Sequence, residues 1–464
     1  MGGIAATQGS ERPNVLLIMV DDLRPELACY GDTPARTPHI DALARSGTLF
    51  RRAYCQQALC APSRASLLTG LRPDSLGVMD LSHPVRQTRP DVRTLPQHFR
   101  AAGYTTLALG KIYHHAKDDN GVGWSSPAWE PPNAWNQAID ADNAARGKER
   151  STAWEAADVA DDAYPDGQIA ARAAAELRRF KASGAPFFLA VGFLKPHLPF
   201  FAPKRYWDLY DRSSFTLPAQ RTWPTGMPHI ASMDSEELRQ YRGIPKSGPL
   251  DDELARQLIH GYYACVSYVD AMVGQVLAEL GRTGLRENTV VALLGDHGWK
   301  LDDYGAWCKH TNFEIDTRAP LIVSAPQQRQ TGVSDALVEF VDVFPSLAQL
   351  AGLSVPAECE GTSFVPLLRD PAQPWKTAAF SLYPRGQHVI GYTVRDARWR
   401  YTEWIDRRTG NVTARELYDH AASPVAPTNL ANAPAHAAEV ERLARLLDHG
   451  AGWRQVRAAI SGRE

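Results

Sequence analysis

The chain has 464 residues, of which 44% are hydrophobic and 22% are charged, and its formal net charge is −2. This composition is typical of a globular protein with about two to three domains, or with one large α/β domain and an appendage. The balanced charge excludes a polycationic chain that wraps nucleic acid, so we expect no nucleic-acid partner.

The amino-terminal segment MGGIAATQGSERPN lacks the basic and apolar regions of a signal peptide. No apolar run approaches the roughly 18 residues of a membrane span, so we expect no membrane partner. The sequence as written is therefore expected in the cytoplasm, or in the periplasm or outside the cell if an export signal has been removed. Six cysteines without a paired spacing predict reduced thiols rather than a disulfide framework.

Five short apolar runs are predicted to be buried strands, at 14–20, 105–110, 186–193, 289–295 and 320–325. Their nearly continuous Val, Leu, Ile and Phe content indicates strands that are covered on both faces. Helix-like segments alternate with them, at 38–46, 63–70, 92–102, 165–183, 251–281 and 336–352. The alternation predicts an α/β fold with a large, doubly wound, mostly parallel sheet flanked by helices, in which ligands bind at the carboxyl ends of the strands.

Two stretches, 118–164 and 212–250, fit this alternation poorly and are predicted to be long surface insertions of the kind that often carries function. After a proline-rich stretch near 354–376, four alternating runs predict a small antiparallel sheet, followed by two amphipathic helices. We therefore expect a main domain over 12–360 and a smaller C-terminal subdomain over 361–464.

Acidic side chains follow two of the predicted strands directly. The first strand ends in VDDLRP, which supplies Asp21 and Asp22, and the strand at 289–295 ends in GDHG, which supplies Asp296 and His297. Each pair alone is most simply an exposed turn. If the two strands are neighbours, three carboxylates and an imidazole converge on a divalent-cation site, and mostly oxygen ligands favour Ca²⁺, Mg²⁺ or Mn²⁺.

The run LCAPSRASLLTG places Cys60 just before a predicted helix, because Pro62 suits a first helical turn. Helix N–H groups and Arg64 favour an anion at this place. The same field is expected to lower the pKa of a thiol. Cys60 is therefore a buried apolar residue, a thiolate nucleophile or the precursor of another group.

The run ALCAPSRASLLTG (58–70) resembles the signature of the type I sulfatases, in which the cysteine is oxidised after translation to formylglycine. Four further blocks resemble those of the family in order: 20–32, 110–115, 193–200 and 295–323. The last block, with the KPH run and SLYPRG (381–386), is most similar to the iduronate-2-sulfatase branch. The resemblance covers most of the chain and implies an alkaline-phosphatase-like fold, with 12–360 as the catalytic domain.

The resemblance also implies roles for particular residues. The metal ligands would be Asp21, Asp22, Asp296 and His297 with the modified Cys60. Calcium is the expected metal, with manganese and magnesium as alternatives. The catalytic residues would be Cys60, Arg64, Lys111, His114, His197 and Lys309. Residues expected to contact the substrate are Lys195, Trp299 and His310.

These features predict a sulfuric ester hydrolase whose substrate is a small sulfated molecule, most simply a sulfated sugar. Its maturation would need a formylglycine-generating enzyme as a partner. The alternative is a hydrolase of phosphodiesters or phosphonate monoesters on the same fold. A non-catalytic binder of sulfated glycans is a third hypothesis, and the complete ligand set argues against it.

Overall fold

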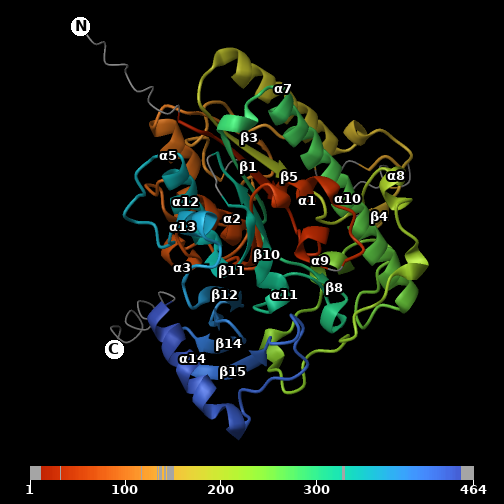
Figure 1. Cartoon of the computed structure of the whole chain (residues 1–464). Coiled ribbons are helices and arrows are strands. Elements are labelled where there is room, and N and C mark those ends of the chain that lie inside the picture. Colours follow the sequence, from red (N-terminus) through yellow and green to blue (C-terminus); the bar gives the residue numbers. More distant parts are fainter. Residues whose placement is uncertain are drawn as a thin grey trace.

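The computed structural model describes residues 12–31, 33–115, 118–132, 134, 138–140, 143, 151–326 and 330–450 (Figure 1). Its centre is a seven-stranded sheet in the order β11-β2-β10-β7-β1-β5-β3. The strands are β1 (Asn14–Val20), β2 (Thr48–Tyr54), β3 (Thr105–Gly110), β5 (Phe187–Phe193), β7 (Thr289–Gly295), β10 (Arg318–Ser324) and β11 (Gly332–Glu339). Only β10 runs against its neighbours among these strands, so the predicted mostly parallel sheet is confirmed.

Helices cover both faces of this sheet (Figure 1). One face packs against α1 (Pro38–Arg45), α7 (Pro165–Ser183) and α10 (Asp252–Arg282), and the other against α2 (Cys60–Thr69), α5 (Leu95–Ala101) and α12 (Val343–Leu350). Along β1, Leu16 and Ile18 enter the first core, whereas Leu17 and Met19 enter the second. This alternation explains why the strand is apolar at every position.

Short elements line the connections between the main helices and strands. They are η1 (Ala28–Tyr30), α3 (Pro73–Leu76), α4 (Val85–Thr88), β4 (Trp154–Glu155), η2 (Asp161–Ala163), β6 (Phe200–Phe201), α8 (Lys204–Trp207), η3 (Arg212–Ser214), η4 (His229–Ala231), α9 (Glu236–Arg239), η5 (Arg286–Asn288), β8 (Lys300–Leu301), η6 (Asp303–Gly305), β9 (Trp307–Cys308), α11 (Glu314–Thr317), η7 (Phe340–Asp342), α13 (Val365–Arg369) and η8 (Pro434–His436). None of the helices that the structure describes is long and apolar enough to cross a membrane.

Two parts of the sheet differ from the sequence prediction. Strand β2 was not predicted, because Arg51 and Arg52 interrupt its apolar run. The helix predicted over 336–352 is wrong in its first part, since β11 continues to Glu339 and α12 begins only at Val343. Strand β11 lies at the edge of the sheet and pairs with β2, and this pairing overrides the helical pattern there.

A smaller antiparallel sheet follows, as the sequence predicted. Its strands are β12 (Ala379–Arg385), β13 (Val389–Arg395), β14 (Trp399–Asp406) and β15 (Val412–Asp419), and α14 (Ala437–Gly450) packs against it. The sheet is tied to the main sheet's side of the molecule by Arg395 and Arg400, whose guanidinium groups lie 2.9 and 2.8 Å from the buried carboxylate of Glu314. The second predicted terminal helix lies outside the described residues.

We expect the substitution Gly192→Ala to destabilise the fold where β3 meets β5. A Cβ at Gly192 would lie 2.0 Å from the carbonyl oxygen of Lys111, so the segment that follows β3 must shift. The expected loss is about 2–4 kcal/mol in the free energy of unfolding, measured by urea denaturation. The control Gly281→Ala, with nothing within 4 Å of its Cβ, should leave the free energy of unfolding unchanged or raise it. A Gly192→Ala variant with an unchanged free energy of unfolding would contradict the packing described.

Candidate active site

Four adjacent strands of the main sheet end at one edge, and each is followed by residues predicted for the site. Strands β7, β1, β5 and β3 run parallel, and their registers align Val20 with both Gly295 and Phe193, and Gly110 with Gly192. The carboxyl ends of the strands are the usual place for ligands in such a sheet. The segments that leave this edge carry Asp21, Asp22, Lys111, His197, Asp296 and His297.

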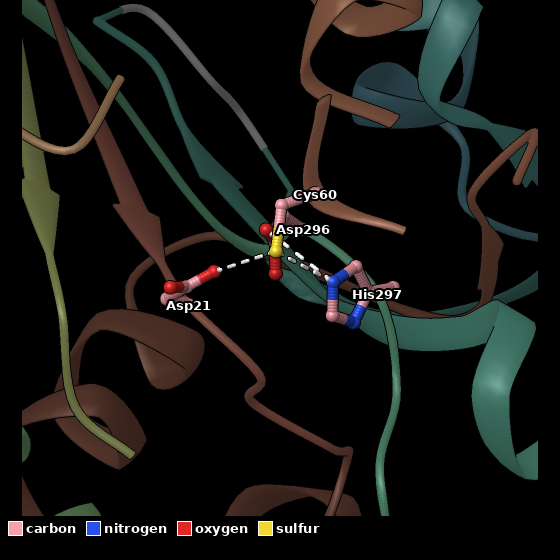
Figure 2. A group of neighbouring side chains, drawn as sticks. All are labelled: Asp21, Cys60, Asp296 and His297. Carbon is pink, nitrogen blue, oxygen red and sulfur yellow. Dashed lines mark hydrogen bonds and ion pairs between the residues drawn. The ribbon is translucent and has the colours of Figure 1, made fainter. Parts of the chain in front are cut away.

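Cys60 begins helix α2 and faces the ends of β1 and β7 (Figure 2). The whole of α2 is buried, and its first intrahelical bond runs from the Ser63 amide to the Leu59 carbonyl. The helix ends at Gly70, which adopts the left-handed conformation that glycine favours at this position. The fully buried helix fixes the direction in which Cys60 points.

Four buried side chains converge at this point (Figure 2). The Cys60 Sγ lies 3.5 Å from Asp21 Oδ1 and 3.4 Å from His297 Nε2. The ligand atoms of Asp21, Cys60, Asp296 and His297 all lie within 4.8 Å of one another. The sequence expectation that the two strand ends meet is therefore realised in the structure.

This group of side chains fits a divalent cation. Its donor set combines two carboxylates, one imidazole and the Cys60 thiol, which are all groups that ligate divalent metals. Asp22 lies beside the group, and its Oδ1 is 3.5 Å from His297 Nε2. Its backbone has a φ of 59°, a conformation that is costly for residues other than glycine and is often found at functional sites.

Three cationic side chains compensate the buried carboxylates. Arg64 is fully buried, and its guanidinium contacts Asp296 at 2.8 Å and Asp21 at 3.1 Å. The Lys111 ammonium donates to the other oxygen of Asp21. Lys309 Nζ lies 2.9 Å from Asp22 Oδ1. Buried charges need such partners, because the loss of hydration is otherwise uncompensated.

The same charges set the ionisation of the site. Although burial alone would raise it, Lys111 and Arg64 hold the pKa of Asp21 well below its ordinary value. Burial, and next the Asp21 carboxylate, raises the pKa of the Cys60 thiol well above its ordinary value. Burial and the neighbouring carboxylate therefore outweigh the helix terminus, and the expectation of a lowered pKa for this thiol is wrong.

His114 lies at the edge of the site as a neutral base. Burial, and next the Lys111 ammonium, lowers the pKa of His114 to about 3. Its Nδ1 is buried without a hydrogen-bond partner in the part of the chain that the structure describes. The ring therefore keeps a free lone pair throughout the neutral and mildly acidic range.

A cavity of about 1290 Å³ opens over these groups. Cys60, Lys111, His114, His197 and Lys309 all line it. Its outer walls come from both long insertions and from the C-terminal sheet, through residues that include Asn143, His229, Tyr241, Tyr383 and Arg385. The insertions predicted to be functional thus shape the space in which a ligand would lie.

The three residues predicted to contact the substrate differ in whether they line the cavity. His310 lines the cavity. The Lys195 ammonium instead donates to the backbone carbonyls of His197 and Pro199, and Trp299 is fully buried with Lys309 Nζ 4.9 Å from its ring centre. Among the described residues, neither Lys195 nor Trp299 lines the cavity. Lys195 therefore supports the segment that carries His197, and Trp299 supports Lys309.

The fold brings into the site one side chain that the sequence did not predict. The Glu237 carboxylate lies 2.9 Å from His197 Nε2 and 2.9 Å from Lys309 Nζ. It belongs to the short helix α9 in the second insertion. The run MDSEELR carries no local signal for this role, because two adjacent glutamates in a helix usually face solvent.

Comparison with known proteins gives a consistent result. The sequence profile of the sulfatase family matches residues 13–353, and that of the N-sulphoglucosamine sulphohydrolase C-terminal family matches residues 296–451. The chain is 34% identical to iduronate 2-sulfatase of Homo sapiens, over 92% of this chain and 92% of that protein.

Two solved structures share the fold. One holds its substrate D-glucosamine-2-N,6-O-disulfate, with a TM-score of 0.79, 23% identity and coverage of 97% of this chain and 99% of the other. The second is the phosphonate monoester hydrolase of Agrobacterium radiobacter, with a TM-score of 0.78, 23% identity and coverage of 97% and 96%. Since both kinds of enzyme have this architecture, the fold alone does not choose between their reactions.

We expect a divalent cation to stabilise the protein through the four converging side chains. Adding Ca²⁺ or Mn²⁺ to chelator-treated protein should raise Tm, because an ion at 100 times its Kd contributes about 2.7 kcal/mol. The increase should be lost in Asp296→Asn and kept in Asp335→Asn, whose carboxylate pairs with Arg51 on the exposed surface. Calorimetry without any shift in the wild-type protein for Ca²⁺, Mg²⁺ or Mn²⁺ would contradict the metal assignment.

Proposed function

Because the chain belongs to the sulfatase family, we propose that it hydrolyses the sulfate monoester of a sulfated saccharide. The chain is an enzyme of the sulfuric ester hydrolase class and is most similar to the iduronate-2-sulfatase branch. The human relative carries the name iduronate 2-sulfatase, which supports a sulfated sugar acid or a related sugar as substrate.

The observation that carries the proposal is the meeting of Cys60 with Asp21, Asp296 and His297, next to a cavity that Cys60, Lys111 and Lys309 line. Burial and the Asp21 carboxylate disfavour a thiolate at this place. A polar group derived from Cys60 would instead face both a cation and the ammonium and guanidinium groups that bind an oxyanion. We infer that Cys60 is converted to formylglycine by a maturation enzyme.

The expected metal ligands are Asp21, Asp22, Asp296 and His297, with the group derived from Cys60. Calcium is the proposed ion because most of these ligands are hard oxygen donors. When present, the cation and the formylglycine hydrate together supply an ionised hydroxyl nucleophile and a second hydroxyl through which sulfate is released.

The cationic side chains stabilise the reacting sulfate. Arg64, Lys111 and Lys309 are held by the carboxylates around them, so their charges are already oriented before substrate binds. Such preorganised charge stabilises the negative charge that develops on the sulfate oxygens. His197, which lines the cavity together with Lys309, donates a proton to the departing alcohol, with Lys309 assisting.

His114 is the proposed base for the release of sulfate. Its ring is neutral because burial and Lys111 lower its pKa to about 3. It lines the cavity together with Lys111 and Cys60. In this proposal His197 would be the acid for the departing alcohol, and His114 would be the base for the release of sulfate.

The C-terminal part contributes to the same cavity. Arg385, on β12, donates to the backbone carbonyls of Ile230 and His310 at 2.9 and 2.8 Å. This clamp joins the small sheet to the second insertion and to the site. We propose a catalytic domain over 12–360 and a subdomain over 361–464 that completes the wall around the sugar.

Conversion of Cys60 should be visible in the intact mass of the peptide that contains it. Replacement of the thiol by an aldehyde lowers the mass by about 18 Da. Cys60→Ala should lose at least about 10⁴-fold in kcat, because the nucleophile is then missing. A fully active preparation in which Cys60 remains an unmodified thiol would contradict the mechanism.

Paired assays should separate the sulfatase from a phosphodiester or phosphonate monoester hydrolase. We expect kcat/KM for sulfated saccharides, tested as 2-O-, 6-O- and N-sulfated forms, to exceed that for an aryl phosphodiester by at least about tenfold, a difference of about 1.4 kcal/mol in the barrier. The sulfate ester group and the phosphodiester group each carry one negative charge, so the charge of the reacting group does not separate the two activities. A large preference for the diester would overturn the proposal.

A further inference from the structure

We propose that Glu237 is a positioning residue, which holds His197 and Lys309 together on the side of the site where the alcohol leaves. The inference rests on the proposed sulfatase function and assigns a role to the second insertion within it. Its basis is a single carboxylate that contacts both side chains, with Oε1 2.9 Å from His197 Nε2 and Oε2 2.9 Å from Lys309 Nζ.

Each of the two side chains also has a fixed contact elsewhere. The other ring nitrogen of His197 lies 2.6 Å from the carbonyl oxygen of Leu198. The Lys309 ammonium donates to both oxygens of Asp22, at 2.9 and 3.1 Å. Glu237 therefore joins two side chains that are anchored on different segments. Without it, Nε2 of the imidazole keeps a longer contact of 3.9 Å with Asp22 Oδ2, whereas Lys309 keeps its two hydrogen bonds to Asp22.

Glu237 is itself rigidly placed. Its helix, α9, lies against β9, and the Ser235 hydroxyl accepts a hydrogen bond of 2.9 Å from the amide of Trp307, two residues before Lys309. The carboxylate lines the cavity but is only 16% exposed. Although burial alone would raise it, Lys309 and His197 hold the pKa of Glu237 well below its ordinary value, so the bridge is ionic.

A positioning role of this kind has a specific kinetic signature. An alcohol of a sugar is a poor leaving group, and its departure needs a proton from a well-placed acid. Because Leu198 holds Nδ1 of His197, that proton would pass to the alcohol oxygen from Nε2, the nitrogen that Glu237 holds in place. A nitrophenolate leaves without that proton. If Glu237 only stabilised the fold, its loss would slow the cleavage of a sugar sulfate and of a nitrophenyl sulfate equally. If it positions His197, its loss slows the cleavage of the sugar sulfate and leaves that of the nitrophenyl sulfate almost unaffected.

The test compares Glu237→Gln with Glu236→Gln, a matched loss of charge at the exposed neighbouring position of the same helix. Each variant is assayed on a sulfated saccharide and on aryl sulfates whose phenols span a range of acidity. For Glu237→Gln we expect kcat on the saccharide to fall about 100-fold and kcat on 4-nitrophenyl sulfate to fall less than about threefold, within the usual range for general acids. Glu236→Gln should keep the wild-type dependence on the leaving group.

An equal loss on all esters, or no loss on the saccharide, would overturn the positioning role. A crystal structure of Glu237→Gln gives a second readout that does not depend on turnover: we expect the His197 ring to turn away from Lys309, and an unmoved ring would sink the proposal. If the wild-type protein cleaves no sulfate ester, the proposed sulfatase function is refuted. The position of the His197 ring in the Glu237→Gln structure would still decide the role of Glu237.

Discussion

The active site depends on the compensation of carboxylates that are buried at the shared edge of β1 and β7. Asp21, Asp22 and Asp296 are each fully inaccessible to solvent, and ionised groups in such a place are stable only with nearby positive charge. The compensating groups come from elsewhere in the chain, with Arg64 on α2 and Lys309 after β9. A bound divalent cation would complete the compensation of these negative charges. Metal binding is therefore expected to stabilise this edge of the sheet.

This electrostatic requirement also explains why the surrounding structure is rigid. Helix α2 is buried along its whole length, so Cys60 and Arg64 have little freedom to move. The Lys195 ammonium fixes the loop that carries His197, and the ring of Trp299 lies beneath Lys309. Groups that must meet a reacting sulfate are therefore oriented before it arrives, and catalysis benefits because no reorganisation remains. Substrate choice falls to the outer walls of the cavity, which the insertions and the C-terminal sheet supply.

Those walls are built from segments that are distant in sequence. The second insertion brings Glu237 to His197 and Lys309, and the C-terminal sheet reaches the same region through Arg385. The small sheet is fixed to the main sheet's side by Arg395 and Arg400, which share the buried carboxylate of Glu314. Loss of either connection would alter the shape of the cavity without touching the residues that hold the metal.

The sequence by itself determined the parts of this protein that local patterns encode. Apolar runs predicted the central strands, and acidic pairs at their ends predicted the converging carboxylates around Cys60. Only the tertiary structure placed β2 and β11 in the sheet, because β2 is interrupted by arginines and β11 takes its strand form from pairing with β2. Only it identified Glu237 and showed that Trp299 is a buried support, since contacts between separate segments arise from chain packing and leave no periodic trace.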